Sequence, residues 1–304
     1  MFRSLFHMRA SRPRLAGLML AVGAALGFSM KAVFVKLAYR YGVDAVTLLM
    51  LRMLFALPFF IVIALLEERK ASAPVGMRSM LLVLILGLIG YYLSSMLDFA
   101  GLQYITAGLE RLILFVYPAF VVIFSALFLG KKIGKEEVMA LLLCYAGIAI
   151  AMYHDVQFSG ADTWRGVLLV LAATISYALF LIGSGEMIPK IGARRFTAYA
   201  MIVSCLAALI QFVLLRQLTD FQQPLPVYGY GFAMAVFSTV IPAFLLAAAI
   251  QRVGAGTASV VGALGPVMTI GLAVLLLGET ATWMQMVGAL LVIGGVSMLG
   301  VRKG

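Results

Sequence analysis

Long, uninterrupted apolar runs are the feature that most limits how this chain can fold. The runs last about 17 to 25 residues, and they include the stretches from Leu15 to Leu26 and from Met80 to Ile89. A helix needs about 20 residues to cross a hydrocarbon core of about 30 Å, and inside that core every backbone polar group must be satisfied by the protein. Only helices and closed barrels meet this requirement, and barrel strands would show short alternating segments. The runs therefore predict an all-α membrane protein.

Composition leads to the same fold class. Of the 304 residues, 64% are hydrophobic and 12% are charged, whereas soluble domains are roughly 45 to 50% apolar and about 25% charged. This excludes a soluble globular protein, and the hydrophobicity excludes a disordered chain. We expect one bundle of ten transmembrane helices with short connections, at residues 15–39, 45–66, 79–102, 105–129, 137–153, 166–183, 196–215, 227–250, 255–277 and 283–301.

The distribution of basic residues predicts the orientation. If the N-terminus is cytoplasmic, the inside segments hold 16 of the 23 Lys and Arg residues, the outside loops hold three and the spans hold four. Short cytoplasmic loops of membrane proteins carry such an excess. Both termini are therefore predicted to be cytoplasmic, and the net charge of +11 is a topology signal instead of the mark of a nucleic-acid partner. Segment 1–14 superficially fits a secretory signal, but we expect the apolar run after it to be retained as the first span.

The chain also repeats itself. A displacement of 148 residues gives ten identities in 49 positions, with punctuating Gly and Pro in register: Pro118 with Pro266, Gly130 with Gly278, and Gly147 with Gly295. Because five spans per copy is an odd number, the second copy enters the membrane from the opposite side. We expect a cytoplasmic N-terminal segment 1–14, a first five-helix repeat 15–153, an outside linker 154–165 and a second, inverted repeat 166–304.

Inverted repeats indicate a function. Two similar halves related by an axis in the membrane plane can open to one side and then exchange roles to open to the other, which is alternating access. The sequence therefore predicts a secondary transporter. A duplicated structural or assembly protein without transport is the plainer alternative.

Several motifs resemble those of a known family. Ala-Gly pairs, Ala107-Gly108 and Ala255-Gly256, open the fourth and ninth spans, and each of these spans has a central Pro. Leu276 to Glu279 ends the ninth span and is followed by Gly288 and Gly294-Gly295. In these features and in its ten spans, nearly the whole chain resembles the drug/metabolite transporter (DMT) superfamily, in the branch made of two tandem EamA-type halves. It departs from the pattern at Lys131, where the first half lacks the usual acid.

The resemblance implies a multi-pass protein of the bacterial cytoplasmic (inner) membrane that exports or exchanges small metabolites. Amino acids, neutral or aromatic, and related compounds are common cargo, but the shared motifs do not fix the substrate. A proton antiporter for drugs or other toxic compounds is the alternative. The expected partners are a small-molecule substrate and the lipid bilayer, with proton coupling open.

Six ionisable residues lie within the expected spans, all in the outer half of the first repeat: Lys31, Lys36, Arg52, Asp98, Glu110 and Arg111. Such groups cost about 2.5 to 3.5 kcal/mol each on insertion scales and usually face the bundle interior or a wet cavity. The second repeat offers apolar, aromatic and hydroxyl side chains instead. We therefore expect an asymmetric cavity whose second wall includes Ser176, Tyr177, Phe180, Ser238 and Thr239.

The hypothesis for binding assigns a role to each wall. Cationic groups, with Lys31 and Arg52 foremost, receive a substrate carboxylate, and tyrosines pack its apolar part. Helical spacing places Tyr91, Ser95 and Asp98 on one face of the third span. The full set of candidate substrate-binding residues is Lys31, Arg52, Tyr91, Ser95, Asp98, Tyr117, Ser176, Tyr177, Phe180 and Ser238.

Two further roles are expected near this cavity. Glu110 and Arg111 are candidates for gating or coupling, and the alternative for Lys31 and Arg52 is an ion pair with Asp98 or Glu110 that acts as an outer gate or only packs the bundle. Pro118 and Pro266 each remove a helical hydrogen-bond donor near mid-span. They are candidate hinges, and a passive kink is the alternative.

No motif indicates an enzyme, a metal site or a cofactor. The two histidines, His7 and His154, lie outside the expected spans, and there is no metalloprotease helix, nucleophile elbow or phosphate loop. Cys144 and Cys205 lie within apolar runs, where cysteines mostly act as small hydrophobes. A channel is disfavoured because no ring of acids or carbonyl filter motif is present.

Overall fold

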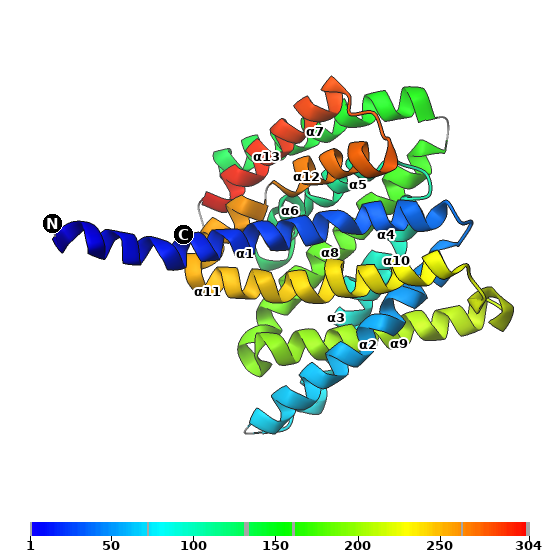
Figure 1. The fold of residues 1–304 in the computed structure, drawn as a ribbon, viewed down its shortest axis with the longest axis horizontal. Helices are drawn as coiled ribbons and strands as arrows, with labels where there is room; N and C mark the ends of the chain where they lie inside the picture. Colours follow the sequence, from blue (N-terminus) through cyan, green and yellow to red (C-terminus); the bar gives the residue numbers. More distant parts are fainter. Residues whose placement is uncertain (1, 72, 131–133, 160–161, 263, 302–304) are drawn as a thin grey trace.

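A computed structural model describes residues 2–71, 73–130, 134–159, 162–262 and 264–301, and all regular secondary structure within them is helical (Figure 1). Seven helices in this part of the chain are long and apolar enough to cross a membrane. Three shorter apolar helices, Val138–Ala151, Gly265–Leu277 and Trp283–Met298, lie within the fifth, ninth and tenth expected spans. The prediction of a helical, multi-pass membrane protein is confirmed.

The first half of the chain forms a series of helices in the expected order. They are α1 (Phe2–Tyr39), α2 (Ala45–Lys70), α3 (Met77–Gly87), the π-helix η1 (Leu88–Leu93), α4 (Ser94–Gly101), α5 (Ala107–Leu114), α6 (Tyr117–Leu129) and α7 (Lys135–Ser159). Since α3, η1 and α4 follow one another without a gap, they form one span.

The second half follows with α8 (Thr163–Ile191), α9 (Ala193–Leu215), the short 3-10 helix η2 (Leu218–Phe221), α10 (Leu225–Ala235), the π-helix η3 (Val236–Val240), α11 (Ile241–Gly262), α12 (Gly265–Leu272), the π-helix η4 (Ala273–Leu277) and α13 (Trp283–Val301). The π-helices η1 and η3 begin at residues 88 and 236, which differ by the repeat displacement of 148 residues.

The eighth and ninth expected spans are not separated where the sequence analysis placed their boundary. Helix α11 runs without interruption to Gly262, through the expected break at residues 251–254. Glycine is tolerated inside a helix at a cost of about 1 kcal/mol, whereas proline favours the first turn. The next helix accordingly begins at Gly265 with Pro266 in its first turn.

Other helix boundaries also extend beyond the sequence-based ones. Helix α1 begins at Phe2 instead of residue 15, and α8 continues past residue 183 to Ile191. The linker expected at 154–165 is largely helical, because α7 continues to Ser159 and α8 begins at Thr163. Hydropathy marks where apolar residues stop, and a helix can continue beyond that point into polar residues.

Helices that are distant in sequence pack along each other. Helix α1 lies along α11, and α7 lies along α13 (Figure 1). Helix α2 also packs against α9, and α4 packs against α8. The α7–α13 pair is close because of glycines: a Cβ built on Gly147 would lie 2.7 Å from the carbonyl oxygen of Gly288, and one built on Gly295 would lie 2.7 Å from that of Ala140. Small residues allow this close approach of membrane helices.

Candidate functional site

Lys31 and two acids form the most buried charge cluster of the structure's described part. The ammonium Nζ of Lys31 in α1 lies 2.5 Å from Oδ2 of Asp98 in α4 and 2.9 Å from Oε1 of Glu110 in α5. The side chains of Asp98 and Glu110 are 4% and 0% exposed, and that of Lys31 is 15% exposed. One lysine is therefore the shared counter-ion of two buried carboxylates, and the ion pairing that the sequence analysis gave as the alternative for Lys31 is present.

Arg52 lies beside this cluster with different partners. It is 8% exposed, its Nε lies 3.3 Å from Oγ1 of Thr239, and its guanidinium carbon lies 5.5 Å from the ring centroid of Phe99. It interacts electrostatically with Asp98. Within the described residues it forms no ion pair closer than 4 Å, so the alternative of an ion pair, which was given for both cations, is present for Lys31 and not for Arg52.

The aromatic candidates meet in a second cluster. Tyr117 of α6 packs edge-on against Tyr177 of α8 with ring centroids 5.4 Å apart, Tyr177 lies 5.8 Å from Phe180, and Phe180 lies 4.8 Å from Tyr91. Phe180 is 3% exposed and packs on Gly90, where a Cβ would clash with its ring. The structure therefore brings all four aromatic candidates together.

Arg111 lies next to the aromatic cluster. It interacts electrostatically with Tyr117 and Tyr177, and its guanidinium reaches Gly265 at the start of α12. Its Nε is buried and has no hydrogen-bond partner among the described residues. Arg111 thus belongs to the interior of the bundle.

The hydroxyl candidates are mostly engaged in helix packing. Ser176 donates to the carbonyl oxygen of Ile89 at 2.7 Å, and Ser94 of α4, which precedes the candidate Ser95, donates to that of Ala173 at 3.0 Å. Ser238 is 3% exposed and its hydroxyl has no partner within the part of the chain that is described. Ser95 is partly buried in α4, one turn before Asp98.

The two candidate hinge prolines both lie where a span is interrupted. Pro118 is in the first turn of α6, after the break that follows α5 at Phe115 and Val116. Pro266 is in the first turn of α12. The expected interruptions at mid-span are therefore present, and motion at these positions stays a prediction.

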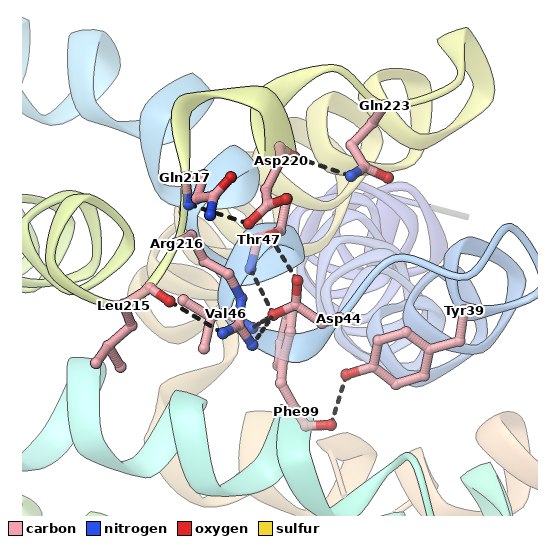
Figure 2. Close-up of polar contacts among 10 residues, drawn as sticks. All are labelled: Tyr39, Asp44, Val46, Thr47, Phe99, Leu215, Arg216, Gln217, Asp220 and Gln223. Carbon is pink, nitrogen blue, oxygen red and sulfur yellow. Dashed lines mark hydrogen bonds and ion pairs between the residues drawn. The ribbon is translucent and has the colours of Figure 1, made fainter.

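The ends of α2 and α9 are joined by polar contacts that the sequence analysis missed. At the end predicted to be outside, here called the outer end, Arg216 lies 3.0 Å from Oδ1 of Asp44, which also caps α2 by accepting from the backbone of Val46 and Thr47 (Figure 2). Burial raises the pKa of Asp44, but hydrogen bonds from Arg216 and Thr47 outweigh it and hold that pKa below its ordinary value.

At the opposite end, Glu68 of α2 accepts from Arg195 of α9 at 2.6 Å and also from the hydroxyl of Tyr199. The signal available in the sequence was that residues of opposite charge lie at both ends of two repeat-related spans. Charge counting alone assigned these residues to loops or span ends and did not pair them.

The outer end also joins the two halves of the chain. Arg40 donates to the carbonyl oxygen of Leu277 at 2.7 Å, and the backbone nitrogen of Ala107 donates to Glu279 at 3.2 Å. A pocket of about 300 Å³ between them is lined by Lys36, Tyr39, Arg40, Leu277 and Glu279. Lys36 therefore lies at this pocket, apart from the buried cluster around Lys31.

Fold and site together define a multi-pass helical membrane protein with ion pairs and an aromatic cluster inside its bundle. The model of the EamA-like transporter family matches residues 15–153 and again residues 164–301. The chain belongs to this family, and the resemblance to the DMT superfamily is confirmed.

Individual relatives support this assignment to the family. "Uncharacterized transporter YcbK" of Bacillus subtilis (strain 168) is 29% identical over 291 residues, covering 94% of this chain and 91% of that protein. "Uncharacterized transporter YetK" of the same organism is 25% identical over 274 residues, covering 89% and 79%. A crystal structure of a protein with 15% identity matches at a TM-score of 0.66 and covers 95% of this chain and 99% of its own, which shows a shared fold alone.

Proposed function

We propose that the chain is a secondary transporter, and not an enzyme, that exports or exchanges small metabolites by alternating access between two inverted five-helix repeats. The observation that carries the proposal is a set of equivalent contacts in the two halves. Membership of a transporter family supports the general role. Amino acids, neutral or aromatic, are the proposed cargo, and the bacterial cytoplasmic membrane is the proposed location.

The equivalent contacts follow the displacement of 148 or 149 residues. A Cβ on Gly17 would meet Val253, and a Cβ on its counterpart Gly166 would meet Ile105, which is the counterpart of Val253. In the same way, the approach of Gly147 to Gly288 corresponds to that of Gly295 to Ala140. When a two-fold axis relates two repeats, each contact between the repeats occurs twice, with the counterpart residues exchanged. These two pairs of contacts have this form. With five spans per repeat, that axis lies in the membrane plane, as alternating access needs.

The interior supports a small organic substrate with an acidic group. Arg52 lies close to the ring of Phe99 and Arg111 interacts electrostatically with Tyr177 of the aromatic cluster, and the rings supply apolar surface. Pro118 and Pro266, at the interruptions of two repeat-related spans, are the proposed hinges.

Reconstitution tests this function. The purified chain in proteoliposomes is expected to show saturable uptake, and counterflow that is accelerated by unlabelled substrate on the opposite side, for at least one neutral or aromatic amino acid in a panel that includes charged ones. Single-channel currents without counterflow would contradict the carrier proposal. Transport of drugs alone would replace the proposed cargo but leave the carrier in place.

One observation favours proton antiport as the coupling mode. Lys31 can neutralise only one of Asp98 and Glu110, and Oε2 of Glu110 has no hydrogen-bond partner among the described residues. A carboxylate in this position can take up a proton when its counter-ion is shared. Counterflow with an imposed pH gradient tests this: Glu110→Gln is expected to exchange substrate normally and to lose acceleration by the gradient, whereas equal acceleration in both proteins would exclude Glu110 as the proton site.

A further inference from the structure

Arg111 is a partly buried cation, with a fully buried Nε, for which the described part of the chain supplies no close counter-ion. Lys31 has two carboxylates, and Arg52 has a threonine hydroxyl and an aromatic ring. Glu110 precedes Arg111 and interacts with it electrostatically, but the close ion pair of Glu110 is with Lys31. An ionised group inside a membrane bundle is costly unless it is paired, and it usually marks a binding site. Arg111 therefore lacks the counter-ion that a charged group inside a membrane bundle usually has.

The surroundings of Arg111 have the shape and chemistry of an acceptor for an anion with an apolar body. On one side lies Gly265, where a Cβ would be 3.0 Å from Nη2 and 3.5 Å from Nε. The guanidinium also interacts electrostatically with Tyr117 and Tyr177. Gly265 is also the first residue of α12, and the N-terminal end of a helix favours negative charge. The guanidinium thus lies against bare backbone and within electrostatic reach of two tyrosines.

Arg111 also lies close to the axis that relates the repeats. Its two neighbours Tyr117 and Gly265 are counterparts under the displacement of 148 residues. A two-fold axis passes midway between two counterpart residues. A side chain that is close to both of them is therefore near that axis. Because a single site has to face each side of the membrane in turn, transporters of this type bind substrate at that axis. This step rests on the proposed inverted repeat.

The charge balance of the interior also favours an anion bound at Arg111. Lys31, Arg52 and Arg111 carry three positive charges, and Asp98 and Glu110 carry two negative ones. One carboxylate at Arg111 would neutralise the set. Because a guanidinium binds a carboxylate with two parallel hydrogen bonds, it is better suited to this role than an ammonium group.

We propose that Arg111, instead of Lys31, receives the carboxylate of the transported substrate, and that Tyr117 and Tyr177 pack against the substrate's aromatic or aliphatic body. The substrate class is an organic monocarboxylate with an apolar side chain, and its amino group is not required for binding. Lys31 keeps its two acids while substrate binds.

Counterflow of radiolabelled L-phenylalanine in proteoliposomes tests the assignment. Wild-type counterflow is expected to be inhibited by 3-phenylpropionate, which has the carboxylate alone, and not by phenethylamine, which has the amine alone. Arg111→Gln is expected to raise KM by at least about tenfold, since a hydrogen bond to a charged group is lost, and to abolish inhibition by 3-phenylpropionate. Arg165→Gln is the matched control because the side chain of Arg165 is 71% exposed, and its KM should stay within about twofold of the wild-type value.

Gly265→Ala provides a second test that leaves the charge in place. Its added methyl group meets Nη2 of Arg111, so KM should rise while the protein stays monodisperse. An unchanged KM in both Arg111→Gln and Gly265→Ala would overturn the role of Arg111 and leave the transporter intact. Inhibition by phenethylamine and not by 3-phenylpropionate would overturn the substrate class. Absence of counterflow with every member of the amino-acid panel would instead contradict the proposed function.

Discussion

The two halves of this chain have matching scaffold contacts and opposite interior chemistry. Gly166 meets Ile105 much as Gly17 meets Val253. Yet the counterpart of Lys31 is Phe180, which packs on Gly90, while Lys31 is surrounded by carboxylates. The backbone packing is therefore similar in the two halves. The ionisable groups inside the expected spans lie in the first half, where their charges must be balanced. The contacts that the two halves share therefore identify the scaffold, and the positions at which the halves differ identify the candidate site.

The largest effect is expected from removing the cation of the charged half. Lys31→Met leaves Asp98 and Glu110 buried without their shared counter-ion. Breaking a buried ion pair in this way costs about 3 to 5 kcal/mol, so the detergent-solubilised protein should melt at a much lower temperature. Restoring the charge balance in Lys31→Met/Glu110→Gln should recover part of the loss. A Lys31→Met protein as stable as wild type would mean that the cluster is not formed.

A smaller effect is expected where the apolar counterpart of Lys31, Phe180, packs on Gly90 of the first half. Gly90→Ala would place a methyl group against the ring of Phe180, and overpacking of this kind costs about 1 to 3 kcal/mol. Its counterpart variant, Ser238→Ala, removes a buried hydroxyl that has no hydrogen-bond partner among the described residues and should be neutral or slightly stabilising. Thermal unfolding of the two variants side by side measures the asymmetry, and equal losses at both positions would contradict it.

The smallest effect is expected at the outer end, where α2 and α9 are joined (Figure 2). The pKa of Asp44 is held low in the folded protein, so its hydrogen bonds stabilise the fold above the ordinary aspartate pKa of about 3.9, and this contribution is lost as pH falls through the folded-state value. Asp44→Asn should lower stability at pH 7 by at most about 1 kcal/mol, because the pair with Arg216 is partly exposed. The difference from wild type should shrink in melts at acidic pH, and a difference that grows instead would reverse the assignment.

Sequence alone could predict the helical membrane fold and the positions of most spans, because long apolar runs allow few alternatives. It offered the pairing of Lys31 with Asp98 or Glu110 only as the alternative to binding a substrate carboxylate, because span positions alone do not show which side chains meet. It could not predict that α11 continues to Gly262, because whether glycines end a helix depends on packing. Nor could it separate Arg111 from Lys31, since the three-dimensional contacts decide which cation keeps its partner.

The central claim is that the two halves are inverted copies, and side-specific labelling tests it most directly. Tyr41 and Lys190 are exposed counterparts under the displacement of 149 residues, and the native cysteines Cys144 and Cys205 are buried. With a membrane-impermeant maleimide on intact cells, Tyr41→Cys is expected to be labelled at once, and Lys190→Cys only after the membrane is permeabilised. Labelling of both variants from the same side would contradict the inverted repeat and the alternating-access proposal that depends on it.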